Sequence, residues 1–121
     1  MFDRVNINEI DLESCQAHGG LGDILFARLL TSEEVQGPCN FVDVAVLPPG
    51  VSIGYHRHTS NEEEFYLVLS GSGEITRNGE KSRVVAGDLI RNPRGGSHGL
   101  INDGSEPLKI FVFELATSDE K

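Results

Sequence analysis

The sequence predicts an all-β domain, either a sandwich or a small barrel. Short runs of β-branched and aromatic residues recur along the chain, and no long apolar run repeats with the period of a helix. Fourteen glycines and five prolines are spread between these runs as turn signals. Many short strands separated by turns are typical of sandwiches and small barrels.

Six segments have the length and composition of strands and are bounded by turn residues. They are residues 24–30, 41–47, 64–69, 74–77, 80–85 and 108–115. Asn78-Gly79 predicts a two-residue hairpin turn, because both residue types accept the positive φ angles of a type I′ turn. A second turn is predicted at 102–105. Before the first strand, residues 8–14 could form a helical turn.

The chain is long enough for one hydrophobic core and too short for two, with 121 residues. We therefore expect a single domain with an N-terminal arm over residues 1–22, a barrel over 23–115 and a polar tail over 116–121.

The charge balance limits the expected partners. The net charge is −9 and no basic cluster is present, which argues against binding to nucleic acid or to an anionic membrane. No stretch approaches the roughly 18 apolar residues of a membrane span, and the N-terminus lacks a secretory pattern, so a cytoplasmic location is expected. Cys15 and Cys39 are expected to be free thiols. A small molecule or another protein is the expected partner.

Residues 54–71, GYHRHTSNEEEFYLVLSG, place charged side chains directly before a strand. His56 and His58 are two residues apart, so on a strand they project from the same face and could bind one metal ion. In the next strand Glu64 shares a face with Tyr66 and Val68, and both faces of that strand are largely apolar. Glu64 therefore points toward protein, where an uncompensated carboxylate is costly. A metal shared with the histidines would remove that cost; the alternative is a surface histidine pair beside a solvated acidic turn.

A second stretch, GDLIRNPRGGSHGLIN at residues 87–102, introduces His98 after a Gly-Gly turn. Together the two stretches resemble the two motifs of the cupin family. The positions that match the first motif are Gly50, His56, His58, Glu64 and Gly71, with one extra residue between His58 and Glu64. The positions that match the second motif are Gly87, Pro93, Arg94, Gly95, His98 and Asn102.

The extra residue leaves a choice of glutamate. Glu62 or Glu63 would satisfy the family's gap from His58, whereas only Glu64 satisfies the spacing to Gly71. We favour Glu64, because strand register is fixed by the pleat while a loop absorbs an insertion at little cost.

The resemblance implies an antiparallel jelly-roll β-barrel in which His56, His58, Glu64 and His98 bind one divalent transition metal. Three imidazoles and one carboxylate suit iron, manganese, nickel, zinc or cobalt. Four protein ligands on an octahedral ion would leave two positions for water, oxygen or a chelating substrate.

Two further residues are candidates for roles beside the metal. Tyr66 points the same way as Glu64 and could donate a hydrogen bond to a metal-bound ligand or act as an acid or base; the alternative is a structural tyrosine. Arg91 could face inward and bind a substrate carboxylate. The other orientation, outward in an ion pair, is favoured. Arg57 should point away from the metal.

The motif glycines, Pro93 and Asn102 are interpreted as scaffold, with Asn102 capping a turn.

Strands 41–47 and 64–69 are apolar on both faces, more than the inside of one thin barrel needs. We therefore expect a homodimer, formed through sheet-to-sheet or edge-strand contact, in which the N-terminal segment could cross over to the partner.

The resemblance favours a metal-dependent enzyme, a dioxygenase, decarboxylase, isomerase or lyase, acting on a small chelating oxygenated or carboxylated molecule. The alternatives are a non-catalytic module that binds a sugar or metabolite, and a protein whose barrel serves in assembly. One cupin scaffold supports many reactions, so the sequence predicts no particular substrate.

Overall fold

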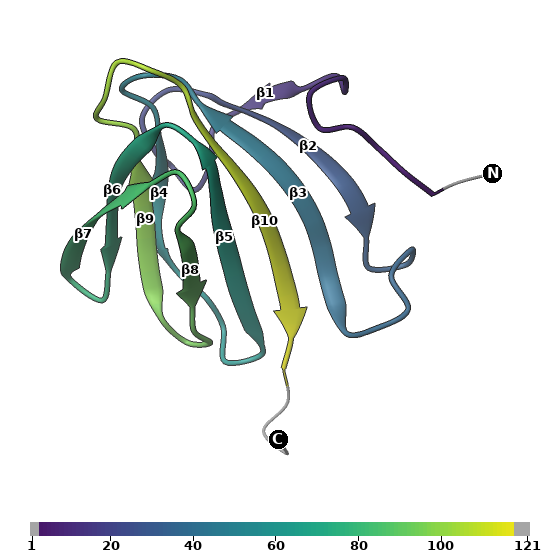
Figure 1. Cartoon of the computed structure of the whole chain (residues 1–121). Coiled ribbons are helices and arrows are strands. Elements are labelled where there is room, and N and C mark those ends of the chain that lie inside the picture. Colours follow the sequence, from purple (N-terminus) through teal and green to yellow (C-terminus); the bar gives the residue numbers. More distant parts are fainter. Residues whose placement is uncertain (1–2, 118–121) are drawn as a thin grey trace.

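The computed structural model describes residues 3–117, which form ten β-strands and no helix (Figure 1). The strands are β1 (Glu13–Cys15), β2 (Ile24–Thr31), β3 (Cys39–Leu47), β4 (Ser52–Arg57), β5 (Glu62–Ser70), β6 (Ser72–Arg77), β7 (Glu80–Val85), β8 (Leu89–Asn92), β9 (Ser97–Ile101) and β10 (Leu108–Ala116). Residues 3–117 contain no helix long and apolar enough to cross a membrane. The predicted all-β class is confirmed.

The strands form two antiparallel sheets (Figure 1). The larger sheet has the order β1-β2-β3-β10-β5-β8 and the smaller has the order β4-β9-β6-β7. The chain crosses repeatedly from one sheet to the other, as it does in a jelly roll. In the described residues the two sheets do not join into one hydrogen-bonded ring, so the barrel is open at its edges.

All six predicted strands are present, as β2, β3, β5, β6, β7 and β10, each within two residues of its predicted bounds. Composition does not predict β1, β4, β8 or β9, which are short or interrupted by glycine and histidine. The helical turn considered for residues 8–14 does not form. Instead Glu13–Cys15 pairs with β2, whose edge supplies the backbone hydrogen bonds. The predicted boundaries of arm, barrel and tail stay predictions, and residues 118–121 lie outside the described residues.

The two predicted turns are present. Asn78 and Gly79 have φ angles of 49° and 83°, as the hairpin between β6 and β7 requires. Asn102 stabilises the turn before β10: its Oδ1 accepts a hydrogen bond from the Gly104 backbone N–H at 3.0 Å. Its Nδ2 donates to the carbonyl oxygens of Leu47 and Glu106. The predicted capping role of Asn102 is therefore confirmed.

The core lies between the sheets and changes character along its length. Leu47, Leu100, Leu108 and Ile110 are almost completely buried. Toward the beginning of β5 and the end of β10, however, the buried inward-facing side chains are polar. These buried polar side chains are His58, Glu64, His98 and Glu114. The fold thus gathers titratable groups at one end of an otherwise apolar interior.

Candidate metal centre

Four predicted ligands are brought together from both sheets. His56 lies in β4 directly opposite His98 in β9, and His58 follows the end of β4. Glu64 reaches them from β5 in the larger sheet. Each residue offers one ligand atom, and these four atoms lie within 4.8 Å of one another.

The separations of three of the four ligand atoms match those around a single ion. Oε1 of Glu64 lies 3.2 Å from Nε2 of His98 and 3.3 Å from Nε2 of His58, and the two Nε2 atoms are 3.4 Å apart. Donors that each lie about 2.0–2.2 Å from one ion are about 3 Å apart when they are neighbours around it. The cluster therefore has the dimensions of a transition-metal site.

His56 gives the most direct sign that the site fits a metal. Its Nδ1 lies 2.7 Å from the carbonyl oxygen of Gly54, which can only accept, so Nδ1 carries the proton. Nε2 is then unprotonated and carries a free lone pair, and it is buried with no hydrogen-bond partner. A buried acceptor without a donor is costly, and a metal ion at the cluster would satisfy it.

The pKa values describe the cluster without an ion. Burial lowers the pKa of His56 to about 4, so its ring is neutral. The hydrogen bond to Glu64 raises the pKa of His58 to about 9, against the effect of burial. Burial alone would raise the pKa of Glu64, but hydrogen bonds to His58 and His98 outweigh it and lower that pKa to about 2. In the ion-free cluster, a proton on His58 thus compensates the carboxylate.

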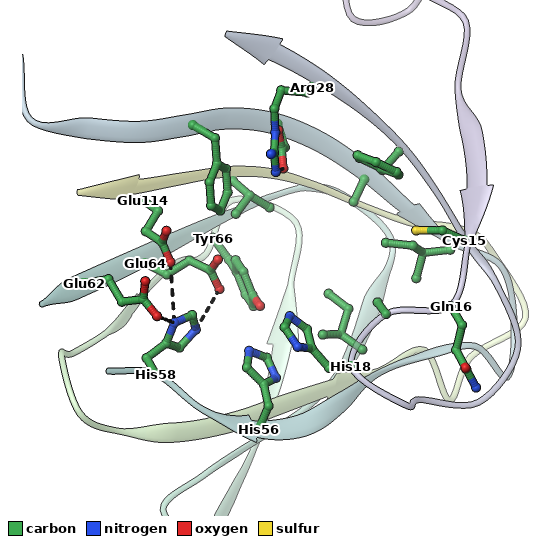
Figure 2. Close-up of a pocket in the computed structure, with 18 of the residues that line it drawn as sticks. Cys15, Gln16, His18, Arg28, His56, His58, Glu62, Glu64, Tyr66 and Glu114 are labelled. Carbon is green, nitrogen blue, oxygen red and sulfur yellow. Dashed lines mark hydrogen bonds and ion pairs between the residues drawn. The ribbon is translucent and has the colours of Figure 1, made fainter. Parts of the chain in front are cut away.

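The other nitrogen of His58 contacts two further carboxylates (Figure 2). Nδ1 lies 3.0 Å from Oε1 of Glu62 and 3.5 Å from Oε1 of Glu114. Asn40 donates a hydrogen bond to Oε2 of Glu114 at 3.0 Å. With Nε2 directed at the cluster, an Nδ1–H group that donates to carboxylates fixes the orientation of the ring. Burial raises the pKa of Glu114.

The three consecutive glutamates have different surroundings. Glu64 lies in the four-atom cluster, and Glu62 lies behind the His58 ring. Glu63 points outward and pairs with Arg91.

Tyr66 points into the cluster, as its spacing from Glu64 indicates. Its hydroxyl oxygen lies 3.0 Å from Nε2 of His98, and the side chain is almost completely buried. Burial and the charge of Glu64 raise the pKa of Tyr66. The phenol therefore stays protonated and can donate a hydrogen bond at the centre.

Arg91 has the outward orientation. Its side chain is exposed and its guanidinium pairs with Glu63, because the alternation of β8 turns Ile90 and Asn92 inward. It does not border the cavity beside the cluster. Its position therefore gives no support to substrate binding. Arg57 is exposed as well, and its Nε donates to the carbonyl oxygen of Gly95.

A cavity of about 540 Å³ adjoins the cluster (Figure 2). Its volume lies in the range of roughly 300–1,000 Å³ that is usual for small-molecule sites. His56, His58, Glu64 and Tyr66 form one part of its lining, and apolar side chains of β2, β3 and β10 form another.

Sequence reasoning missed His18 at this cavity, as it did Arg28 and Glu114. The ring of His18 stacks on that of His56 with centroids 3.5 Å apart and planes 6° apart. The arm reaches this position because Gly54 has no side chain: a Cβ there would lie 2.0 Å from the carbonyl oxygen of His18. A glycine inside a strand commonly marks the close approach of another backbone, and Gly54 was therefore an available signal.

Comparisons with known proteins agree with this geometry. The sequence model of the family described as "Cupin domain" matches residues 43–114. An oxalate-binding protein of Thermotoga maritima is 35% identical over 94 residues, which cover 78% of this chain and 77% of the relative. A dimethylsulfoniopropionate lyase of Ruegeria pomeroyi is 31% identical over 113 residues, which cover 90% of this chain and 72% of the relative.

A solved structure described as a predicted oxalate decarboxylase of Thermotoga maritima superposes with a TM-score of 0.89 and 32% identity. The match covers 93% of this chain and 98% of that one. The family motifs and the cluster of three histidines and one glutamate lie within residues 43–114, which the family model matches. The chain belongs to the cupin family.

Proposed function

We propose that this protein is a metal-dependent enzyme that acts on a small chelating carboxylic acid. One divalent transition metal would be held by His56, His58, Glu64 and His98. The observation that carries the proposal is the buried Nε2 of His56, which has no hydrogen-bond partner and lies within 4.8 Å of the other three donor atoms.

A bound metal would supply Lewis-acid or redox chemistry to a substrate that chelates it. The chain's own residues have separate tasks. Glu62 and Glu114 hold the His58 ring through Nδ1. The protonated hydroxyl of Tyr66 is placed to donate a hydrogen bond to a substrate oxygen at the centre, or to transfer its proton there.

Names of relatives support a carboxylate ligand. One relative is named for oxalate binding, and another is a lyase of dimethylsulfoniopropionate, which is also a carboxylate. The reaction classes that we propose are decarboxylation, oxygen-dependent cleavage and isomerisation. The oxalate-binding name also favours a second candidate, a module that binds a small acid without turnover.

The metal assignment is tested with a matched pair of glutamates. Elemental analysis should find one divalent metal per wild-type chain and little in Glu64→Gln. Glu63→Gln, which changes the neighbouring outward residue, should retain the metal. Equal metal content in Glu64→Gln and wild type would contradict the assignment.

The reaction class is tested on the metal-loaded protein with a set of small chelating acids and phenols, each with and without oxygen. Turnover only with oxygen would select the dioxygenase proposal, and turnover without it would select decarboxylation or isomerisation. Tight binding of one acid without any turnover would replace the enzyme with the binding module.

We also propose that the chain forms a homodimer through the outer face of the larger sheet. Phe65, Phe111 and Phe113 form an aromatic cluster on this face, and each is only partly buried. A contiguous apolar surface of this kind is typical of an interaction site. The expected cytoplasmic location stays a prediction.

A further inference from the structure

Arg28 lines the cavity on the side opposite His56 and His58 (Figure 2). It lies in β2 directly opposite Asp43 in β3. Nε of Arg28 donates to Oδ1 of Asp43 at 2.9 Å, and Nη2 donates to Oδ2 at 3.0 Å. The guanidinium carbon also lies 4.5 Å from the centre of the Phe41 ring. The guanidinium is therefore held in a fixed orientation at the cavity.

The ion pair with Asp43 leaves part of the guanidinium available. An arginine has five N–H donors, and the two bonds to Asp43 use two of them. Asp43 is buried, whereas 47% of the Arg28 side chain is exposed. Since Arg28 borders the cavity, its remaining donors can reach a ligand there without loss of the pair with Asp43.

The lining of the cavity between Arg28 and the metal centre combines apolar side chains with the hydroxyl of Tyr66 and the carboxylate of Glu114. The apolar lining side chains include Ile24, Phe26, Ala45, Ile53 and Val112. An oxalate ion consists of two joined carboxylates with no carbon between them, so it would occupy the metal end of a cavity of about 540 Å³ and leave the apolar walls without contact. The cavity therefore fits a longer molecule than oxalate.

We propose, on the basis of the proposed function, that the ligand is an elongated acid held at both ends. One end chelates the metal, an apolar body packs against the walls, and a distal acceptor group, best a carboxylate, accepts hydrogen bonds from Arg28. Arg28 is then a substrate-binding residue, and it selects against short diacids such as oxalate. The planar fork of a guanidinium matches a carboxylate in geometry and charge.

The test uses ligands that differ only at the distal end. Calorimetric titration of the zinc-loaded protein compares α-ketoglutarate with α-ketovalerate, and α-ketoadipate with α-ketohexanoate. In each pair the monoacid chelates equally well but ends in a methyl group. At least one diacid should bind about tenfold or more tightly than its matched monoacid, since a hydrogen bond to a charged group contributes that much. Oxalate should bind more weakly than that diacid.

The role of Arg28 is tested with a charge-neutral double variant. Arg28→Gln/Asp43→Asn removes both charges, so that no buried carboxylate is left unpaired, and should abolish the preference for the diacid. Arg28→Lys keeps the positive charge beside Asp43 but loses the fork, and should reduce the preference. As a matched control, Arg83→Gln/Asp103→Asn removes an exposed ion pair outside the cavity and should retain it.

Three results would overturn the proposal. If diacid and monoacid bind equally to the zinc-loaded wild type, the distal contact does not exist. If the preference persists in both Arg28 variants while their zinc content is normal, another residue provides it. If elemental analysis finds no zinc in the wild type, the metal centre itself is refuted, and this proposal with it.

Discussion

The two faces of β5 and β10 carry opposite kinds of side chain at the same end of the molecule. On the inner face, Glu64 of β5 lies opposite Glu114 of β10. One residue along each strand, on the outer face, Phe65 lies opposite Phe113, and their rings stack with centroids 4.8 Å apart. Because side chains alternate along a strand, a single register fixes both arrangements.

The difference shows what each face needs in order to be stable. Two carboxylates opposite each other are destabilising unless other groups compensate them. Here the histidines compensate Glu64, and Asn40 donates to Glu114. The outer phenylalanines stabilise one another by contact but stay partly exposed. The stability of the inner face therefore depends on an ion or a proton that compensates its carboxylates. The stability of the outer face depends on further apolar contact.

His56→Ala is expected to have the largest effect, confined to the inner face. It removes one of the four donors to the metal. Removing a group that only hydrogen-bonds to a metal ligand already lowers metal affinity by about 10–100-fold, so loss of the ligand itself should lower it by more than about 100-fold. In the ion-free protein, the change removes an unpartnered buried nitrogen but also the hydrogen bond to Gly54 and the stacking on His18. These effects oppose each other, so the thermal midpoint should change little. Metal titration and thermal unfolding without metal measure the two effects.

The control for His56→Ala is Tyr55→Ala, which changes the neighbouring exposed residue of β4. It should leave metal affinity unchanged. Wild-type affinity in His56→Ala would show that His56 is not a ligand.

Phe65→Ser/Phe113→Ser is expected to have the next largest effect, on the outer face. Light scattering of the wild type should give twice the chain mass of 13.2 kDa, and the variant should give a single chain mass. The physical reason is that the substitutions remove apolar area from the proposed interface. The variant should still bind one metal, which also shows that it is folded. A wild-type mass near 13.2 kDa at micromolar concentration would refute the dimer.

The opposite character of the two faces of β5 was largely predictable from the sequence. Alternation in β5 separates Glu64, Tyr66 and Val68 from the outward residues, and the structure has this separation. The spacing of Glu64 from Gly71 selects it over Glu62 and Glu63, and the structure places its carboxylate in the cluster. Strand period and motif spacing are local properties, which is why the sequence alone could predict them.

Contacts between distant segments were not predictable in this way. The residues around Arg28 predict only a core strand. The position of the Arg28 side chain at the cavity depends on the register of β2 with β3. Glu114 ends the last strand and reaches His58 only because β10 pairs with β5. His18 approaches His56 through a turn of the arm in which His18 itself has a φ of 50°. Each of these depends on tertiary pairing rather than on local pattern.

Glu62→Gln is expected to have the smallest effect, and it tests how the inner face orients the ring of His58. The carboxylate of Glu62 accepts from Nδ1 of His58 at 3.0 Å, and the side chain is partly exposed. Loss of its charge should weaken metal binding by about tenfold, the lower end of the range for groups that orient a ligand. The effect stays small because Glu114 still contacts the same nitrogen at 3.5 Å. Glu62→Gln/Glu114→Gln should therefore lower the affinity further, toward about 100-fold.

Glu63→Gln serves as the control and should match the wild type in the same metal titration. If the double variant binds metal no more weakly than Glu62→Gln, Glu114 does not help to orient His58, and its buried carboxylate serves the cavity rather than the metal centre.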